Sequence, residues 1–223
     1  MSEAKVDLDA LQRRVLETLA DIEPRWTLVG GAALAGFHLH HRTTRDLDLF
    51  WRGLEGLGRI GRECEHRLRT HGMEAAVLQE GATFVRLRVG DGVTTTILDL
   101  VADPSSAIDA PDRFRVGVAT IDVSAVHDLL VDKLCALLSR SELRDLVDVR
   151  ALLGIGVDLD RALDDAPRRD AGFSPLHLTW TLEGLRVEAL GRAADWPEID
   201  VTALGRFRDD LVTRLASRTR PAS

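Results

Sequence analysis

Residues 26–51, WTLVGGAALAGFHLHHRTTRDLDLFW, contain the pattern that decides the fold. The apolar run over 26–29 predicts a short buried strand, the glycine pair after it turns the chain, and residues 32–40 predict a helix. Acidic and apolar side chains then alternate along a predicted strand over 45–51, so the acids share one face of a sheet and the leucines share the other. Strand, glycine turn, helix and strand in this order indicate helices packed on a mixed sheet.

The rest of the chain predicts an α+β half followed by a helical half. Residues 102–114 are rich in Pro, Asp, Ser and Ala and predict a surface loop. Ser124 and Ser141 are expected to be the N-caps of two helices. The further elements expected are helices over 8–22 and 54–69 and strands over 75–79, 83–89, 93–101 and 116–121. No strong strand pattern follows Ser124, which predicts domains over residues 1–123 and 124–223.

The composition is that of an ordinary globular chain, with 45% hydrophobic and 29% charged residues. No apolar run approaches the roughly 18 residues of a spanning helix, and the N-terminus has no signal-peptide pattern, so we expect a cytoplasmic protein with no membrane partner. The net charge of -7 means that RNA would have to bind a local basic patch. Cys64 and Cys135 lack metal-site spacing and are expected to be buried free thiols.

The glycine pair and the acid pair carry the chemistry that this arrangement predicts. Gly30 and Gly31 would let the backbone approach a phosphate closely, and the free amides of the following helix favour its negative charge. Asp46 and Asp48 project from one strand face, where two carboxylates can share hard divalent cations such as Mg²⁺. The glycine pair alone is also typical of an ordinary turn, and the acid pair alone is also typical of a solvated strand. Their combination indicates a phosphate and metal site.

A third carboxylate is expected from a neighbouring strand. Asp99 is the single acid in the apolar, β-rich run Ile97-Leu98-Asp99-Leu100, and we predict that it is the third metal ligand. The alternative is an aspartate that faces a sheet edge. Asp103 is a second candidate, although its position before Pro104 is more typical of a loop.

These residues resemble the glycine pair, paired acids and third acid of the polymerase-β-like nucleotidyltransferases. More closely, Gly30-Gly31-Ala-Ala-Leu-Ala and His41-Arg42-Thr43-Thr44-Arg45-Asp46-Leu47-Asp48 resemble the AbiEii/AbiGii toxin family. Thr44 stands where family members usually have serine, so the hydroxyl is kept. The resemblance implies a polymerase-β-like catalytic core over 1–123 and a helical domain over 124–223 that completes the active site.

The family also has a downstream helical motif, and Asp132-Lys133-Leu134 through Arg144-Asp145-Leu146-Val147-Asp148 is similar to it. The resemblance implies that Lys133 contacts the triphosphate and that Asp145 or Asp148 supports the site. The composition agrees, because Lys133 is one of only two lysines among 29 basic residues and lies in an apolar helix, where a compact ammonium would be needed. The alternative is a structural lysine paired with Asp132 or His127.

The implied reaction is in-line attack of an acceptor hydroxyl on the α-phosphate of a nucleoside triphosphate (NTP), with release of pyrophosphate. Asp46, Asp48 and Asp99 would hold two magnesium ions, and Asp99 is best placed to assist deprotonation of the acceptor. The triphosphate would be held by Gly30, Gly31, Arg42, Thr44 and Lys133.

The acceptor is less well defined by the sequence. The resemblance implies RNA, with the end of a transfer RNA as a leading target, and a cognate antitoxin as a partner. A small-molecule acceptor such as an aminoglycoside is the alternative, and an acidic acceptor pocket would favour that cationic drug. A catalytically silent binding module is a third interpretation. Arginines near the C-terminus would favour RNA, namely Arg206, Arg208, Arg214, Arg218 and Arg220, and Trp180 and Trp196 are expected to pack in the interior.

Overall fold

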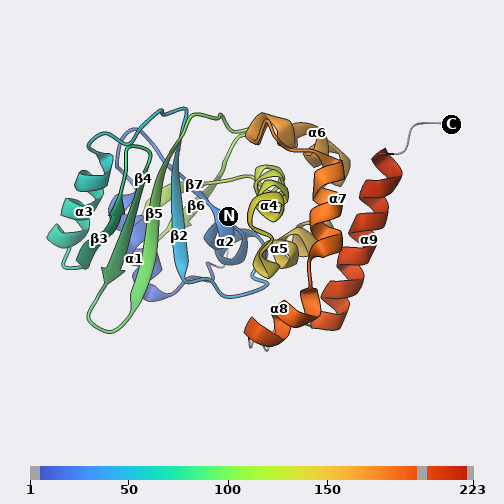
Figure 1. Ribbon diagram of the computed structural model, residues 1–223. Helices are drawn as coiled ribbons and strands as arrows, with labels where there is room; N and C mark the ends of the chain where they lie inside the picture. The colour runs from blue at the N-terminus through green and yellow to red at the C-terminus, as the bar shows by residue number, and fades with distance from the viewer. Residues whose placement is uncertain (1–5, 195–199, 220–223) are drawn as a thin grey trace. The chain divides into compact units, whose positions relative to one another are not determined.

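The structure is a computed structural model that describes residues 6–194 and 200–219. The chain divides into two compact units, residues 1–125 and 126–223. The first unit is built around a seven-stranded sheet, and the second is helical (Figure 1). The predicted fold class, a mixed sheet with flanking helices followed by a helical part, is confirmed.

The sheet of the first unit is mixed and has the order β3-β4-β5-β2-β1-β7-β6. Pairing is parallel between β2 and β5 and between β1 and β7, and antiparallel between the other neighbours. The strands are β1 (Thr27–Val29), β2 (Asp46–Arg52), β3 (Glu74–Glu80), β4 (Phe84–Gly90), β5 (Thr95–Asp103), β6 (Asp112–Val116) and β7 (Ala119–Val123).

One face of this sheet is apolar and covered by helices. The alternating positions Leu47, Leu49 and Trp51 of β2 are fully buried. The pairing of β2 with β5 and of β5 with β4 places them in line with Leu98 and Leu87. Helices α1 (Ala10–Leu19) and α3 (Ile60–Thr70) pack on this face (Figure 1). The opposite face is therefore left to the acidic positions of β2 and β5.

Local sequence explains where α1 begins. The Asp9 carboxylate accepts a hydrogen bond from the backbone N–H of Gln12, and the Gln12 side chain accepts one from the Asp9 N–H. This reciprocal capping satisfies two donors at the start of the helix. The predicted helix after the glycine pair is also present, as α2 (Gly30–Ala33) and the π-helix η1 (Leu34–His38).

In its described residues the second unit has six helices, with α4 at the centre. Its core comes from apolar residues of α4 that are fully buried, including Leu130, Leu134 and Leu137. Helices α5, α6 and α7 contact α4, and α9 contacts α5, α7 and α8. The helices are α4 (Val126–Arg140), α5 (Leu143–Gly154), α6 (Leu159–Arg169), α7 (Pro175–Gly184), α8 (Val187–Ala194) and α9 (Val201–Thr219). No helix in the described part of the chain is long and apolar enough to cross a membrane.

Three sequence predictions about local structure were wrong. The chain forms a hairpin of β6 and β7 where we expected a loop and a single strand, because Gly117 adopts a left-handed φ of +57° that lets the chain reverse. Ser141 is not an N-cap, since its φ is +52° and Glu142 precedes α5. Trp180 is 58% exposed and is not an interior residue. Trp196 lies outside the described residues.

The two cysteines are free thiols, as predicted, but their burial differs. Cys64 is buried and Cys135 is half-buried. Burial raises the pKa of each thiol to about 12. Both thiols are therefore protonated, and poorly nucleophilic, near neutral pH.

The packing of α3 on β4 can be tested at Gly61. A Cβ atom at this position would lie 2.9 Å from Cγ2 of Val85, so Gly61→Ala should destabilise the protein by about 1–3 kcal/mol through overpacking. In a Val85→Ala background the penalty should disappear. Chemical denaturation of the single and double variants measures this coupling. Gly154→Ala, where a Cβ would meet nothing within 4 Å, is the control, and simple additivity at Gly61 and Val85 would contradict the packing.

Candidate active site

The chain turns sharply where β1 ends and α2 begins. Gly30 has a φ of +67°, in the left-handed region that favours glycine. A Cβ atom at Gly30 would lie 2.3 Å from Oδ2 of Asp48. The antiparallel pairing of Val29 with Asp48 sets this approach. A side chain at position 30 would collide with the Asp48 carboxylate, so only glycine allows this turn to lie against β2.

The loop before β2 lies against the same turn. A Cβ atom at Gly31 would lie 2.7 Å from Nη2 of Arg42 and 3.3 Å from Oγ1 of Thr44. The Thr44 carbonyl accepts a hydrogen bond of 3.1 Å from the side chain of Gln12, which ties the loop to α1. The structure thus brings Gly30, Gly31, Arg42 and Thr44 together on one side of Asp48.

The predicted acids lie on one face of neighbouring strands. Asp48 and Asp99 are direct partners in the parallel pairing of β2 with β5, and Asp46 is two residues before Asp48 on the same face. Asp99 is 8% exposed, whereas Asp46 and Asp48 are half-buried. Three carboxylates therefore gather on the sheet face opposite α1 and α3.

Arg86 of β4 is a residue of this cluster that the sequence analysis missed. Its Nε and Nη2 donate hydrogen bonds of 2.8 and 2.7 Å to the two carboxylate oxygens of Asp99. The hydrogen bond and charge of Asp99, with smaller contributions from Asp46 and Asp48, raise the pKa of Arg86. The guanidinium is thus the cation that compensates the acidic cluster.

A signal for Arg86 was present in the sequence. Gly90-Asp91-Gly92 is typical of a hairpin turn, and the observed pairing of Gly90 with Thr95 across it sets Arg86 opposite Asp99. In an antiparallel hairpin each step back along one strand matches one step forward along the other. Four steps from the pair Gly90 and Thr95 therefore lead to the pair Arg86 and Asp99.

The donors on this face of the sheet are carboxylates, the ligand type that a divalent cation such as Mg²⁺ prefers. Across residues 6–194 and 200–219, no group of three or more His, Cys, Asp or Glu side chains is arranged to hold a metal ion. Asp99 does not join such a group because both of its carboxylate oxygens accept hydrogen bonds from the Arg86 guanidinium. The chemistry of the donors still fits Mg²⁺, because carboxylate oxygens are its preferred ligands and the cluster already holds a cation.

Lys133 lies in a buried ionic cluster of the helical unit. Its Nζ is 2.8 Å from Oδ1 of Asp145 and 2.7 Å from Oδ2 of Asp148, and both aspartates are completely buried. Arg140 also donates two hydrogen bonds to Asp145, of 2.7 and 2.9 Å. The partners of Lys133 are thus the two acids of the downstream motif, and not the Asp132 or His127 of the structural alternative.

The charge state of Asp145 follows from these partners. Burial by itself would raise the pKa of its carboxyl, but the hydrogen bond from Arg140 and the charge of Lys133 outweigh burial and hold this pKa below its usual value. Asp145 is therefore ionised across the neutral range, and its negative charge compensates the two cations.

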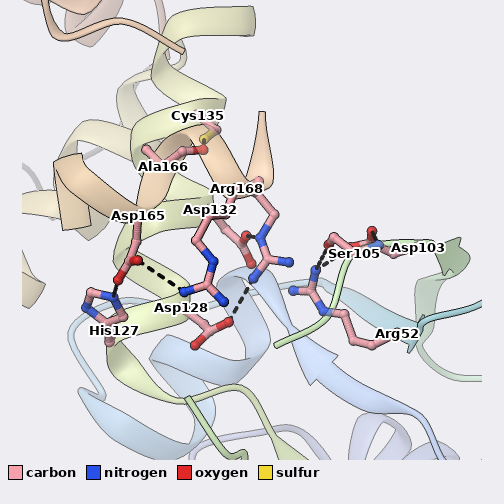
Figure 2. Close-up of polar contacts among 11 residues, drawn as sticks. Arg52, Asp103, Ser105, His127, Asp128, Asp132, Cys135, Asp165, Ala166 and Arg168 are labelled. Atoms are coloured by element: carbon pink, nitrogen blue, oxygen red, sulfur yellow. Dashed lines mark hydrogen bonds and ion pairs between the residues drawn. The ribbon is translucent and has the colours of Figure 1, made fainter. Parts of the chain in front are cut away.

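A second polar cluster joins α4 to α6 within the helical unit (Figure 2). Nε2 of His127 lies 2.9 Å from Oδ2 of Asp165. Arg169 forms ion pairs of 2.7 Å with Asp128 and Asp132. These residues bridge two helices and account for His127, Asp128 and Asp132 among the polar side chains of α4. Asp103, the second candidate for the third acid, instead binds Arg52 and accepts a hydrogen bond of 2.8 Å from the Ser105 N–H (Figure 2).

The arginines near the C-terminus do not form one free basic patch. Arg218 pairs with Asp160 and Asp164, and Arg208 donates to the Leu185 carbonyl. Arg206 and Arg214 are exposed, and Arg220 lies outside the described residues. Part of the expected RNA-binding charge is therefore used to hold α9 in place.

This fold is that of known nucleotidyltransferases. The structure is similar to the nucleotidyltransferase toxin MenT4 from Mycobacterium tuberculosis, with a TM-score of 0.63, 18% identity, and coverage of 91% of this chain and 81% of that one. It is also similar to a putative nucleotidyltransferase from Helicobacter pylori, with a TM-score of 0.50, 20% identity, and coverage of 95% and 96%. At these identities the likeness shows the fold.

The family follows from the sequence match. Residues 14–200 match the family model described as nucleotidyl transferase AbiEii toxin, type IV toxin-antitoxin system. The chain therefore belongs to the AbiEii nucleotidyltransferase toxin family, as the sequence predicted, and its class of activity is nucleotidyl transfer from an NTP. No curated protein matches the sequence.

The turn at Gly30 gives a test of nucleotide binding. Gly30→Ala should cost about 1–2 kcal/mol of stability because of its left-handed backbone, and should also abolish NTP binding because the added methyl displaces Asp48. Gly92→Ala has the same kind of backbone, with φ +86° and nothing within 4 Å of the new Cβ. It should lose similar stability and keep NTP affinity. Equal NTP affinities in calorimetric titrations of the two variants would contradict a role of the Gly30 turn.

The buried cluster around Lys133 gives a test of stability. Asp145→Asn should destabilise the protein at pH 7 by about 3–5 kcal/mol, because two cations lose a buried partner. A carboxyl whose pKa is lowered by folding stabilises the fold above its unfolded pKa, so the difference between wild type and variant should shrink as the pH falls below about 4. Urea denaturation at several pH values measures both effects. Asp160→Asn, whose side chain is 76% exposed, is the control and should change little; a pH-independent loss at Asp145 would argue against the ionised pair.

Proposed function

We propose that this protein is a magnesium-dependent enzyme that transfers a nucleoside monophosphate from an NTP to a hydroxyl of RNA, at the end of a transfer RNA, as the toxin of a toxin-antitoxin pair. The observation that carries the proposal is the position of Asp48. On one side it meets the Gly30 turn, and on the other it pairs in register with Asp99. The turn that would bind the phosphates and the acid that would face the acceptor thus both adjoin the Asp48 carboxylate.

Within this proposal Asp46, Asp48 and Asp99 hold the metal. Bound Mg²⁺ would offset phosphate charge and lower the pKa of the acceptor hydroxyl. Asp99 accepts the proton of that hydroxyl, and it becomes available to do so once Arg86 no longer holds both of its oxygens. The amides of the glycine turn, the Arg42 guanidinium and the Thr44 hydroxyl bind the β- and γ-phosphates.

In this proposal Lys133 binds the triphosphate through the one N–H group of its ammonium that is not directed to an aspartate. An ammonium has three N–H donors, and two of them are directed to Asp145 and Asp148. The third can donate to a phosphate oxygen while the aspartates keep the ammonium in place. Asp145 and Asp148 are then positioning residues, which is the supporting role expected of the downstream acids.

The experiment is a transfer assay with magnesium, each labelled NTP in turn and total transfer RNA. Wild type should label the RNA, and Asp46→Ala and Asp48→Ala should lower the rate by at least about 1,000-fold, since several kcal/mol of charge stabilisation are lost. Asp122→Ala, an aspartate of β7 whose carboxylate pairs with Arg25, is the matched control and should retain the rate.

The outcomes separate the proposal from its alternatives. Labelling of an aminoglycoside in place of RNA would keep nucleotidyl transfer and reject the RNA acceptor. A folded protein that labels neither acceptor with any NTP would support the silent binding module. Equal rates for wild type and Asp46→Ala would remove the carboxylates from the mechanism.

A further inference from the structure

Strand β4 extends the acidic face of the sheet with basic and aromatic side chains. In the antiparallel pairing of β4 with β5, Arg86 stands opposite Asp99, Arg88 opposite Ile97 and Phe84 opposite Val101. These three positions of β4 are two residues apart and share one face, about 6.6–6.8 Å from one to the next. We call Phe84, Arg86 and Arg88 the β4 strip.

The β4 strip is accessible. Arg86 and Arg88 are exposed and Phe84 is half-buried. The Arg86 guanidinium lies 5.5 Å from the centroid of the Phe84 ring. Among the residues that the structure describes, none forms an ion pair with Arg88. The next strand, β3, places the uncharged Ala76 and Gln79 opposite Arg88 and Arg86, so no acid stands beside them there.

The reaction geometry assigns a role to this side of the sheet, an assignment that rests on the proposed function. In-line displacement puts the attacking oxygen and the leaving pyrophosphate on opposite sides of the α-phosphate. The glycine turn, Arg42 and Thr44 lie on the β1 side of Asp48, so the pyrophosphate leaves toward β1. The acceptor must then approach over β5 and β4.

We propose that the β4 strip binds the acceptor strand, and that this acceptor is the single-stranded end of an RNA. Arg88 pairs with a backbone phosphate, and Phe84 offers a ring on which an unpaired base stacks. Arg86 remains near Asp99 and adds positive charge beside the attacking hydroxyl. Each group matches one part of a nucleotide: phosphate, base and sugar hydroxyl.

The same charges disfavour the small-molecule alternative. A cationic antibiotic that approached Asp99 over β4 would meet the exposed Arg88 guanidinium, and like charges at short range repel. An acidic acceptor pocket would have favoured such a drug, and β4 instead presents basic residues there. The acceptor side therefore selects a polyanion.

The test is RNA binding without turnover. A fluorescein-labelled transfer RNA is titrated with protein in magnesium buffer without NTP, and fluorescence anisotropy is recorded at several salt concentrations. Arg88→Glu should weaken binding about 10-fold or more and lower the slope of log K against log salt by about 1, because one phosphate contact is lost. Phe84→Ala should weaken binding about 10-fold with an unchanged salt slope, because a stacking contact is uncharged.

Two controls make the result specific. Arg62→Glu reverses the same charge at an exposed position of α3, on the opposite face of the sheet, and should bind RNA as wild type does. NTP affinity and thermal unfolding are measured for every variant, and both should stay at the wild-type values for Arg88→Glu, so that a folding defect is distinguished from lost RNA contact.

The outcomes of this test and of the transfer assay are separable. If RNA is labelled but Arg88→Glu and Phe84→Ala bind it as well as Arg62→Glu does, the β4 strip is rejected and the proposed function stands. If RNA binding depends on the strip but no RNA is labelled, the strip is supported and the proposed function fails. Wild type that does not bind RNA, or that labels an aminoglycoside instead, overturns the inference.

Discussion

The parallel, in-register pairing of β2 with β5 is the constraint on which the rest of the first unit depends. Because Asp48 is the direct partner of Asp99, the strand alternation sends the carboxylates to one face and Leu47, Leu49, Leu98 and Leu100 to the other. A slip of one residue would bury the acids under α1 and α3 and expose the leucines. The hydrophobic core thus stabilises the fold and also holds the acids in place.

Carboxylates gathered in this way carry an electrostatic cost, and each unit offsets that cost with its own cations. On the sheet, Arg86 neutralises Asp99 in a planar, bidentate contact. In the helical unit, Lys133 and Arg140 neutralise two buried aspartates. Asp145 and Asp148 are completely desolvated, so losing Lys133 would take a cationic partner from two buried carboxylates. In this chain the lysine and the two acids therefore form one interdependent cluster.

Much of the first unit could be predicted from residue patterns alone. The strands on either side of the glycine turn, the acidic alternation in β2 and the hairpin turn at Gly90-Asp91-Gly92 are local features, so short-range sequence rules describe them. The hairpin of β6 and β7 was missed because β6 carries polar residues on its exposed positions, which resemble a loop. Ser141 was mistaken for a cap because the sequence cannot show that its backbone is left-handed.

The sequence by itself determined the class of protein and indicated the acids of the candidate site, because the glycine pair and the alternating aspartates are set by spacing along one segment. Only the tertiary structure decided which cations meet those acids. Arg86 reaches Asp99 across a strand pair, and Lys133 reaches Asp145 and Asp148 across two helices. Such contacts depend on register and on helix packing. These are properties of several segments together, and no single segment of the sequence contains them.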